Sequence, residues 1–116
     1  MALVYDLQVY KCSYDLIIKI YNIVKNYNRE YKYTIGEQLK NETLHLIMDI
    51  YRANVSNQKD KHIQNAREEL EIVKLLLRLS KDLKLINIKN YSDISLLIEN
   101  ISKQLTGWQK YINTKK

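Results

Sequence analysis

Residues 59–86 read KDKHIQNAREELEIVKLLLRLSKDLKLI, and this stretch decides the fold because its spacing predicts one long helix that is apolar around most of its circumference. Successive residues of a helix lie about 100° apart, so five charged residues fall within roughly 80° of one another. These five, here called the basic strip, are Arg67, Glu71, Lys74, Arg78 and Lys81.

The basic strip has aliphatic side chains on both sides. One flank holds Ala66, Leu70, Val73 and Leu77, and the other holds Ile72, Leu75, Leu76, Leu79 and Leu83. A helix on the outside of a monomeric bundle needs an apolar stripe only about 100° wide. Two apolar flanks therefore predict that this helix is buried twice, once by its own domain and once by another chain.

The charges of the basic strip have two explanations, and the sequence leaves both open. Arg78 lies four residues before Asp82, and Glu71 lies three before Lys74, so mixed charges that merely solvate a helix explain them. Alternatively, the strip binds a polyanion, which the formal net charge of +6 and the pI near 9.3 favour. Nucleotide bias in the genome is an alternative explanation for the abundance of Asn, Lys, Ile and Tyr, and so for part of this charge.

The composition indicates one all-α domain. The chain has 116 residues, no Pro and two Gly, which favours long uninterrupted helices over a sheet with many turns. The lone Cys12 excludes an intramolecular disulfide and suits a reducing compartment. No apolar run approaches the ~18 residues of a membrane span, and Met1–Asp6 lacks the features of a signal peptide. We therefore expect a cytoplasmic protein.

Apolar residues at three- and four-residue steps predict four helices, over about 6–27, 34–54, 59–86 and 88–111, in one domain spanning residues 1–116. Thr34 and Glu37 form a predicted capping box for the second helix, and Asn87 is the expected N-cap of the fourth. We expect a polar connection at 26–32 and a frayed tail at 113–116. The seam of the fourth helix consists of Tyr91, Ile94, Ile98, Ile101, Leu105, Trp108 and Ile112. Short connections favour an antiparallel up-down-up-down four-helix bundle.

Catalytic and metal-binding patterns are almost absent. Glu42-Thr-Leu-His45 has the Glu-x-x-His spacing of di-iron bundles, but no second helix repeats it, and His62 has no partner at a metal-site spacing. Cys12 has no His nearby in the sequence, which favours a structural thiol over a nucleophile. Gly36 and Gly107 form no phosphate loop, so close helix approach or fraying explains them. We expect no enzyme activity, no cofactor and no metal.

The aromatic content is unusual, with ten Tyr, one Trp and no Phe. Packing in helix seams, with the hydroxyls at the edges, is the structural interpretation for Tyr10, Tyr14, Tyr21 and Tyr91. The functional alternative is base stacking beside a cation, as in proteins that bind single strands. The better candidates for stacking are Tyr27, Tyr31 and Tyr33, which are interleaved with Lys25, Arg29 and Lys32.

Several blocks of the sequence, taken in order, resemble a known family. They are Tyr14-Asp-Leu, Tyr33-Thr-Ile-Gly-Glu-Gln-Leu, Ile50-Tyr-Arg-Ala-Asn, Ala66-Arg-Glu-Glu-Leu-Glu, Leu75-Leu-Leu-Arg-Leu-Ser-Lys-Asp-Leu and Leu105-Thr-Gly-Trp-Gln-Lys. Together they resemble the accessory variability determinant of diversity-generating retroelements. That family lies within a four-helix-bundle superfamily that includes proteins encoded in ribosomal RNA intervening sequences. The intervening-sequence branch usually closes its second helix with a run like Asn-Ile-Ala-Glu-Gly, whereas Asp49-Ile-Tyr-Arg-Ala-Asn stands here.

The resemblance implies a non-enzymatic partner of a reverse transcriptase. Proteins of this family form a homopentameric, barrel-like ring with a basic surface. They associate with the reverse transcriptase and with template RNA, and they support the error-prone cDNA synthesis that diversifies a target gene. DNA is a further candidate ligand.

The resemblance also indicates candidate nucleic-acid-binding residues. Arg67 in Ala-Arg-Glu-Glu and Arg78 in Leu-Leu-Arg-Leu match basic positions of the family motif. Helix geometry, rather than the motif, adds Lys74 and Lys81. Arg52 is a further candidate, although we expect its neighbour Asp49 to neutralise it.

Two rival interpretations remain open. One is an intervening-sequence-type bundle with a structural or interaction role. The other is a metal-binding or enzymatic four-helix bundle.

Overall fold

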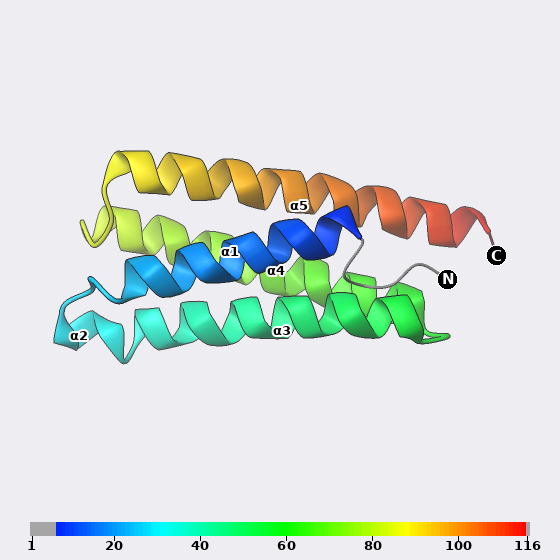
Figure 1. Ribbon diagram of the computed structural model, residues 1–116, viewed down its shortest axis with the longest axis horizontal. Coiled ribbons are helices and arrows are strands. Elements are labelled where there is room, and N and C mark those ends of the chain that lie inside the picture. The colour runs from blue at the N-terminus through cyan, green and yellow to red at the C-terminus, as the bar shows by residue number, and fades with distance from the viewer. Residues whose placement is uncertain (1–6, 116) are drawn as a thin grey trace.

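The computed structural model describes residues 7–115, which form four long helices and one short helix (Figure 1). The long helices are α1 (Gln8–Val24), α3 (Ile35–Val55), α4 (Lys59–Asp82) and α5 (Ile88–Thr114), and the short one is α2 (Arg29–Lys32). Successive long helices run antiparallel, and α1 and α4 each pack against both α3 and α5. Residues 7–115 contain no strand, and the prediction of an all-α four-helix bundle is confirmed.

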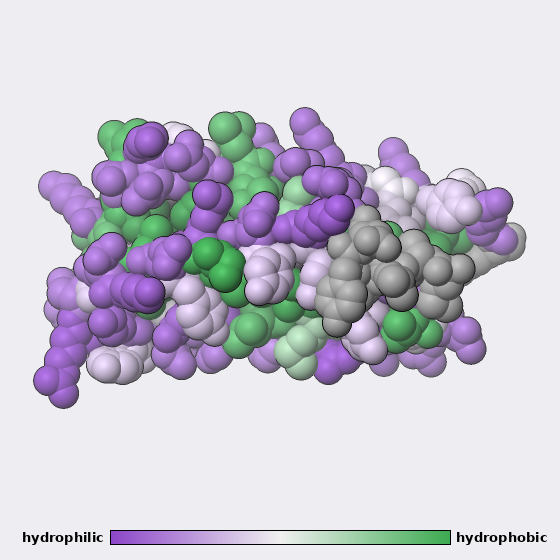
Figure 2. Space-filling model, viewed as in Figure 1, coloured by the Kyte–Doolittle hydropathy of each residue, from purple (hydrophilic) through white to green (hydrophobic). Residues whose placement is uncertain are grey.

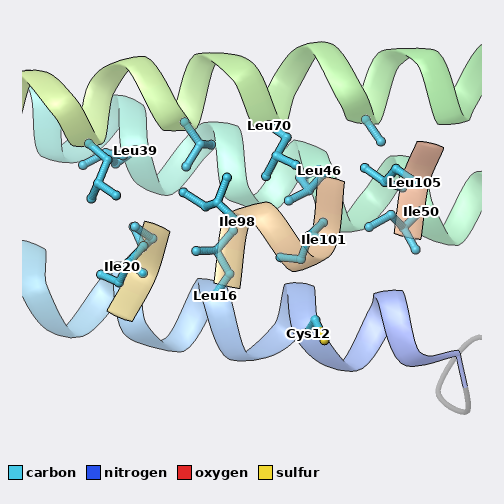
Figure 3. Close-up of a cluster of buried hydrophobic side chains, with 14 of the residues drawn as sticks. Cys12, Leu16, Ile20, Leu39, Leu46, Ile50, Leu70, Ile98, Ile101 and Leu105 are labelled. Carbon is cyan, nitrogen blue, oxygen red and sulfur yellow. The ribbon is translucent and has the colours of Figure 1, made fainter. Parts of the chain in front are cut away.

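Aliphatic side chains from all four long helices meet along the bundle axis (Figure 3). The labelled members are Cys12, Leu16, Ile20, Leu39, Leu46, Ile50, Leu70, Ile98, Ile101 and Leu105. Fully burying one aliphatic side chain contributes about 1.5–3 kcal/mol, so this cluster supplies most of the driving force for folding. The predicted seam of α5 supplies four buried residues, Ile94, Ile98, Ile101 and Leu105. Cys12 is buried here as a free thiol, with Nε2 of Gln104 at 3.5 Å from its Sγ.

The connection between α1 and α3 differs from the sequence prediction. Residues 29–32 form the short helix α2, whose N-cap Asn28 accepts a hydrogen bond from the Tyr31 amide. The predicted capping box at Thr34 and Glu37 is wrong, because the Thr34 side chain makes no cap hydrogen bond. Its hydroxyl lies 3.1 Å from the Glu30 carbonyl oxygen and 3.3 Å from that of Tyr31. The Thr34 hydroxyl therefore donates to carbonyl groups of α2, a helix that the periodicity did not indicate.

The ends of the last two helices also differ from the predicted bounds. α4 stops at Asp82 rather than Ile86, because Lys84 adopts a left-handed conformation with φ of 63°. The amides of Lys84 and Leu85 donate to the carbonyl oxygens of Lys81 and Ser80, which is the Schellman pattern that ends a helix. The predicted N-cap Asn87 is confirmed, since its Oδ1 accepts from the Asn90 amide at 2.7 Å. α5 extends to Thr114, into the tail expected to fray, while the expected helix start at residue 6 lies outside the described residues.

The two glycines have different surroundings. A Cβ atom at Gly36 would lie 2.7 Å from Cγ1 of Val24, so the close-approach explanation is confirmed there. A Cβ atom at Gly107 would meet nothing within 4 Å, and this position is exposed. Gly36 therefore lets the start of α3 pack tightly against the end of α1, whereas Gly107 has no such role within one chain.

Candidate nucleic-acid interface

The basic strip runs along α4, and its two central cations point outward. Lys74 is exposed and has no ion pair or hydrogen bond within residues 7–115. The Arg78 side chain is 63% exposed, and its Nε lies 3.5 Å from Oδ2 of Asp82. An exposed pair of this kind is worth at most about 1 kcal/mol and exchanges readily for a phosphate partner. Lys74 and Arg78 are therefore the members of the strip most open to a polyanion.

The other two cations of the strip join α4 to α5. Nη1 of Arg67 donates a hydrogen bond to Oε1 of Gln109. The Gln109 amide in turn donates to Asp60 and Gln64, both at 3.1 Å. Nζ of Lys81 lies 4.8 Å above the centroid of the Tyr91 ring. Arg67 and Lys81 thus contact side chains of α5, so they are less available to a polyanion than the sequence suggested.

The fifth candidate, Arg52, lies apart from the strip on α3. Its Nη1 is 3.6 Å from Oδ1 of buried Asp49, as the expected neutralisation requires. Nδ1 of His62, on α4, lies 3.4 Å from the same Asp49 oxygen. Burial raises the pKa of the nearby Glu69 to about 8, with further upward contributions from the Asp49 hydrogen bond and the charges of Asp49 and Glu42 and an opposing one from Arg52. Arg52 therefore belongs to a polar seam between α3 and α4.

The two aliphatic flanks of α4 have opposite surroundings. Ala66, Leu70, Val73 and Leu77 are all buried, at 0–2% exposure. On the other flank, Ile72, Leu75, Leu79 and Leu83 are 42%, 67%, 41% and 39% exposed. We call these four residues the outer α4 row. One flank therefore packs in the bundle core, and the other, apart from Leu76, which is half-buried against the core, is uncovered in a single chain.

A second exposed apolar surface lies over α1 and α3, and the sequence analysis missed it. Its members, here called the α1–α3 face, are Tyr14, Ile18, Leu44, Met48, Tyr51 and Val55, which are 38–53% exposed. The contact between Nζ of Lys40 and the Tyr21 ring, 5.4 Å apart, marks where the two helices meet. Around the axis of α1, Tyr14 and Ile18 lie within about 80° of Tyr21. Around the axis of α3, the four members on that helix lie within about 80° of Lys40, so both rows border this contact. Figure 2 shows hydrophobic patches over these two helices.

The α1–α3 face had a readable signal. Leu44, Met48, Tyr51 and Val55 recur at steps of four, three and four, which is the spacing of a helix stripe. The stripe lies beside a second apolar row on the same helix, Leu39, Leu46 and Ile50, which is buried in the core, so apolar spacing alone does not separate the two. The structure adds the α1 neighbours, which periodicity within one helix cannot reveal.

A concentration of cations at one end of the bundle was also missed. The connection 25–34 and the connection 83–87 lie at the same end of the molecule (Figure 1). The two connections hold four basic residues, Lys25, Arg29, Lys32 and Lys84, and one acidic residue, Glu30, while Lys89 and Asp82 lie at the adjoining helix ends; we call this region the cationic end. Only three of these cations are close in the sequence, so the clustering depends on the antiparallel fold.

The tyrosines proposed for base stacking separate into distinct classes. Tyr27 is 4% exposed and belongs to the core, and burial raises its pKa. Tyr31 is half-buried, and Tyr33 is 68% exposed. The packing interpretation holds for Tyr10, Tyr21 and Tyr91, which are partly buried, whereas Tyr14 is 53% exposed.

The described residues, 7–115, contain neither a candidate metal-binding group nor a candidate membrane-spanning helix. No group of three or more His, Cys, Asp and Glu side chains there is arranged to hold a metal ion. No helix in that range combines the length and the apolar character needed to cross a membrane.

Comparison with known proteins gives one informative result. Residues 7–112 match the model of the bAvd-like family, a span that includes all four long helices almost to the end of α5. No curated protein matches the chain. The matched span agrees with the motif blocks that carried the resemblance. The chain therefore belongs to the bAvd-like family.

Proposed function

We propose that this protein is a non-enzymatic accessory protein of a diversity-generating retroelement, acting in the cytoplasm. It assembles as a homopentameric ring that binds the reverse transcriptase and the template RNA or its cDNA, and it supports mutagenic reverse transcription. Membership of the bAvd-like family supports the accessory role. The observation that carries the assembly is the outer α4 row, four aliphatic side chains that a single chain leaves uncovered.

The exposed apolar surfaces favour a ring over a two-fold dimer. The outer α4 row and the α1–α3 face lie on different sides of the bundle, because Asp49, which pairs with Arg52 on α3, contacts His62 on α4 across a polar seam between them. In a head-to-tail assembly, the outer α4 row of one copy packs on the α1–α3 face of the next. Such heterologous contacts close into a ring when the rotation between copies allows it. Burying both surfaces removes ten exposed apolar side chains from water.

The assembly also strengthens the electrostatic argument. A formal net charge of +6 on one chain is modest, but a ring repeats it and places several basic strips on one particle. Binding RNA to such a surface releases condensed counterions, so affinity falls steeply with salt. Lys74 and Arg78 supply contacts to phosphates and read no bases. Sequence selection then comes from the reverse transcriptase or from the shape of the RNA.

The assembly is tested by native mass measurement. Leu75→Glu combined with Leu79→Glu places two charges in the outer α4 row, and we expect the pentamer to dissociate to monomers. Leu96→Glu is the matched control, since Leu96 is 66% exposed on α5, outside both apolar surfaces. A wild-type protein that is monomeric, alone and with its reverse transcriptase, would contradict the proposal and favour the intervening-sequence-type interpretation.

RNA binding is tested by charge reversal on the basic strip. Lys74→Glu with Arg78→Glu is the first variant, because both side chains are exposed and neither holds helices together. We expect a loss of affinity of about 10-fold or more and a shallower dependence on salt, with the native mass unchanged. Lys103→Glu with Lys110→Glu on α5 gives the same change in net charge as a control. Adding Arg67→Glu and Lys81→Glu should abolish binding, and unaltered RNA binding by that fourfold variant rejects the strip as the interface.

A further inference from the structure

A polar cleft of about 220 Å³ lies between the end of α1 and the beginning of α5. Its lining consists of Lys19, Asn22, Ile23, Asn26, Asn90, Asp93 and Ile94. The residues come from positions about 70 apart in the sequence, so only the antiparallel packing of α1 and α5 brings them together. No motif in the sequence indicated this cleft.

The chemistry of the lining is that of a site for a flat polar group. Each of the three asparagines offers an amide donor and a carbonyl acceptor, while Lys19 offers a cation and Asp93 an anion. Within residues 7–115, none of these five side chains hydrogen-bonds to another group. The apolar part of the lining is provided by Ile23 and Ile94, which are 9% and 2% exposed. Exposed donors and acceptors thus form the rim of the cleft, over a floor of two nearly buried isoleucines.

Two of the three asparagines, Asn22 and Asn90, have no evident structural purpose, whereas Asn26 lies in the turn that follows α1. Asparagine is a weaker helix former than the lysine, glutamate or alanine that a solvated helix surface usually carries. Asn22 lies inside α1, and Asn90 lies in the first turn of α5, where its amide is already capped by Asn87. Neither carboxamide caps a helix or joins two helices.

The cleft lies beside the cationic end of the bundle. Lys25 and Lys89 are the sequence neighbours of the lining residues Asn26 and Asn90. Arg29, Lys32 and Lys84 lie at the same end, on the connections drawn at the left of Figure 1. Cations therefore border a cleft that itself offers directional hydrogen bonds.

We propose that this cleft binds one unpaired nucleotide of the RNA that the basic strip attracts, an inference that rests on the proposed function. The base enters between α1 and α5 above Ile23 and Ile94, and its edge hydrogen-bonds with the exposed carboxamides of Asn22, Asn26 and Asn90. Lys25 and Lys89 contact the flanking phosphates. Carboxamides recognise base edges through paired donor and acceptor contacts, and unpaired bases expose those edges. A base held in a duplex cannot enter, so the cleft gives the ring a preference for single strands.

The test compares single-stranded and duplex RNA of the same sequence. The variant Asn22→Ala, Asn26→Ala, Asn90→Ala should bind the single strand about 10-fold more weakly and the duplex with unchanged affinity. Its helix content should not fall, because alanine favours helices. The matched control replaces three exposed asparagines elsewhere, Asn41, Asn57 and Asn113, with alanine. Equal binding of the single strand by wild type and variant overturns the proposal.

A second measurement separates base recognition from phosphate binding. Adding a nucleoside monophosphate should shift the side-chain amide resonances of Asn22, Asn26 and Asn90 in the NMR spectrum of the intact protein. If inorganic phosphate alone causes the same shifts, the site is an anion site and base recognition is rejected.

The two proposals fail in different ways. Loss of both RNA forms in the Lys74→Glu, Arg78→Glu variant, with no effect of the asparagine variant, supports the strip and rejects the cleft. A selective loss of single-strand binding in the asparagine variant, with no effect of the fourfold strip variant, supports the cleft and rejects the strip.

Discussion

The core-facing and outward-facing sides of α4 are almost equally aliphatic, yet the bundle uses them differently. Leu70 is 2% exposed, whereas Leu75, little more than one turn later, is 67% exposed. The first contributes to folding of the single chain, because its burial removes apolar surface from water. The second contributes nothing there and gains burial only from a partner. The apolar content of a helix therefore does not by itself measure how much that helix stabilises its own chain, and under the proposed assembly the exposed side would stabilise the contact between chains.

The largest expected effect compares these two leucines directly. Leu70→Ala should lower the free energy of unfolding by about 3 kcal/mol, because it leaves a cavity among side chains of four helices. Leu75→Ala should change it by less than about 0.5 kcal/mol when the copies are dissociated by dilution. Urea unfolding followed by circular dichroism measures both. Similar losses for the two variants would show that the outer row is covered within one chain.

The two glycines extend the comparison to the backbone. Gly36→Ala forces a methyl group to within 2.7 Å of Val24 Cγ1, and we expect a loss of about 2 kcal/mol. Gly107→Ala places its methyl group in open space and should stabilise the dissociated chain by about 1 kcal/mol through helix propensity. Thermal unfolding measures both changes. A destabilising Gly107→Ala in the assembled protein alone would indicate that another chain approaches α5 at that position.

A smaller effect concerns the polar seam that separates the two apolar surfaces. The pKa of Glu69 is raised from 4.5 to about 8, first by burial and then by Asp49 and Glu42, so the folded protein holds a proton that the unfolded chain releases. The stabilising contribution of that proton is complete below pH 4.5 and is lost as the pH rises through about 8. Arg52 and His62 both lie beside Asp49, and the positive charge of Arg52 opposes the rise in the pKa of Glu69.

Glu69→Gln tests this titration, since the amide stays neutral at every pH. We expect it to raise the free energy of unfolding by about 1 kcal/mol at alkaline pH, a figure that allows for solvent screening, and to change it little near pH 4.5. Its exposed neighbour Glu68 supplies the control, because Glu68→Gln should leave the pH dependence intact. Denaturant unfolding across the pH range measures both variants, and parallel curves for wild type and Glu69→Gln would count against the assignment.

Features local to one helix were predictable from the sequence. The helix-forming periodicity, the Asn87 cap and the α5 seam all depend on residues within a few turns of one another. Thr34 was predicted wrongly because a preceding helix competes for its hydroxyl. The end of α4 was missed because a lysine occupies the left-handed position where glycine is the usual signal.

Features that need two helices were not predictable in the same way. The α1–α3 face and the α1–α5 cleft depend on which helices are neighbours and in which register they pack. The sequence showed that the strip is charged. It did not show that Arg67 and Lys81 contact α5, because their partners Gln109 and Tyr91 lie on another helix. The spacing of residues in one helix shows toward which side of that helix each side chain points. Which side chains of two helices form one surface depends on how the helices pack.

The left-handed conformation of Lys84 links the stability of the bundle to the positive charge at one of its ends. A non-glycine residue in that conformation costs about 1 kcal/mol relative to glycine, so Lys84→Gly would give a more robust bundle. The same change would remove a positive charge from the cationic end. Under the proposal that this end contacts RNA, thermostability and nucleic-acid affinity compete at this position, and a screen for heat resistance alone would select a chain with less positive charge there.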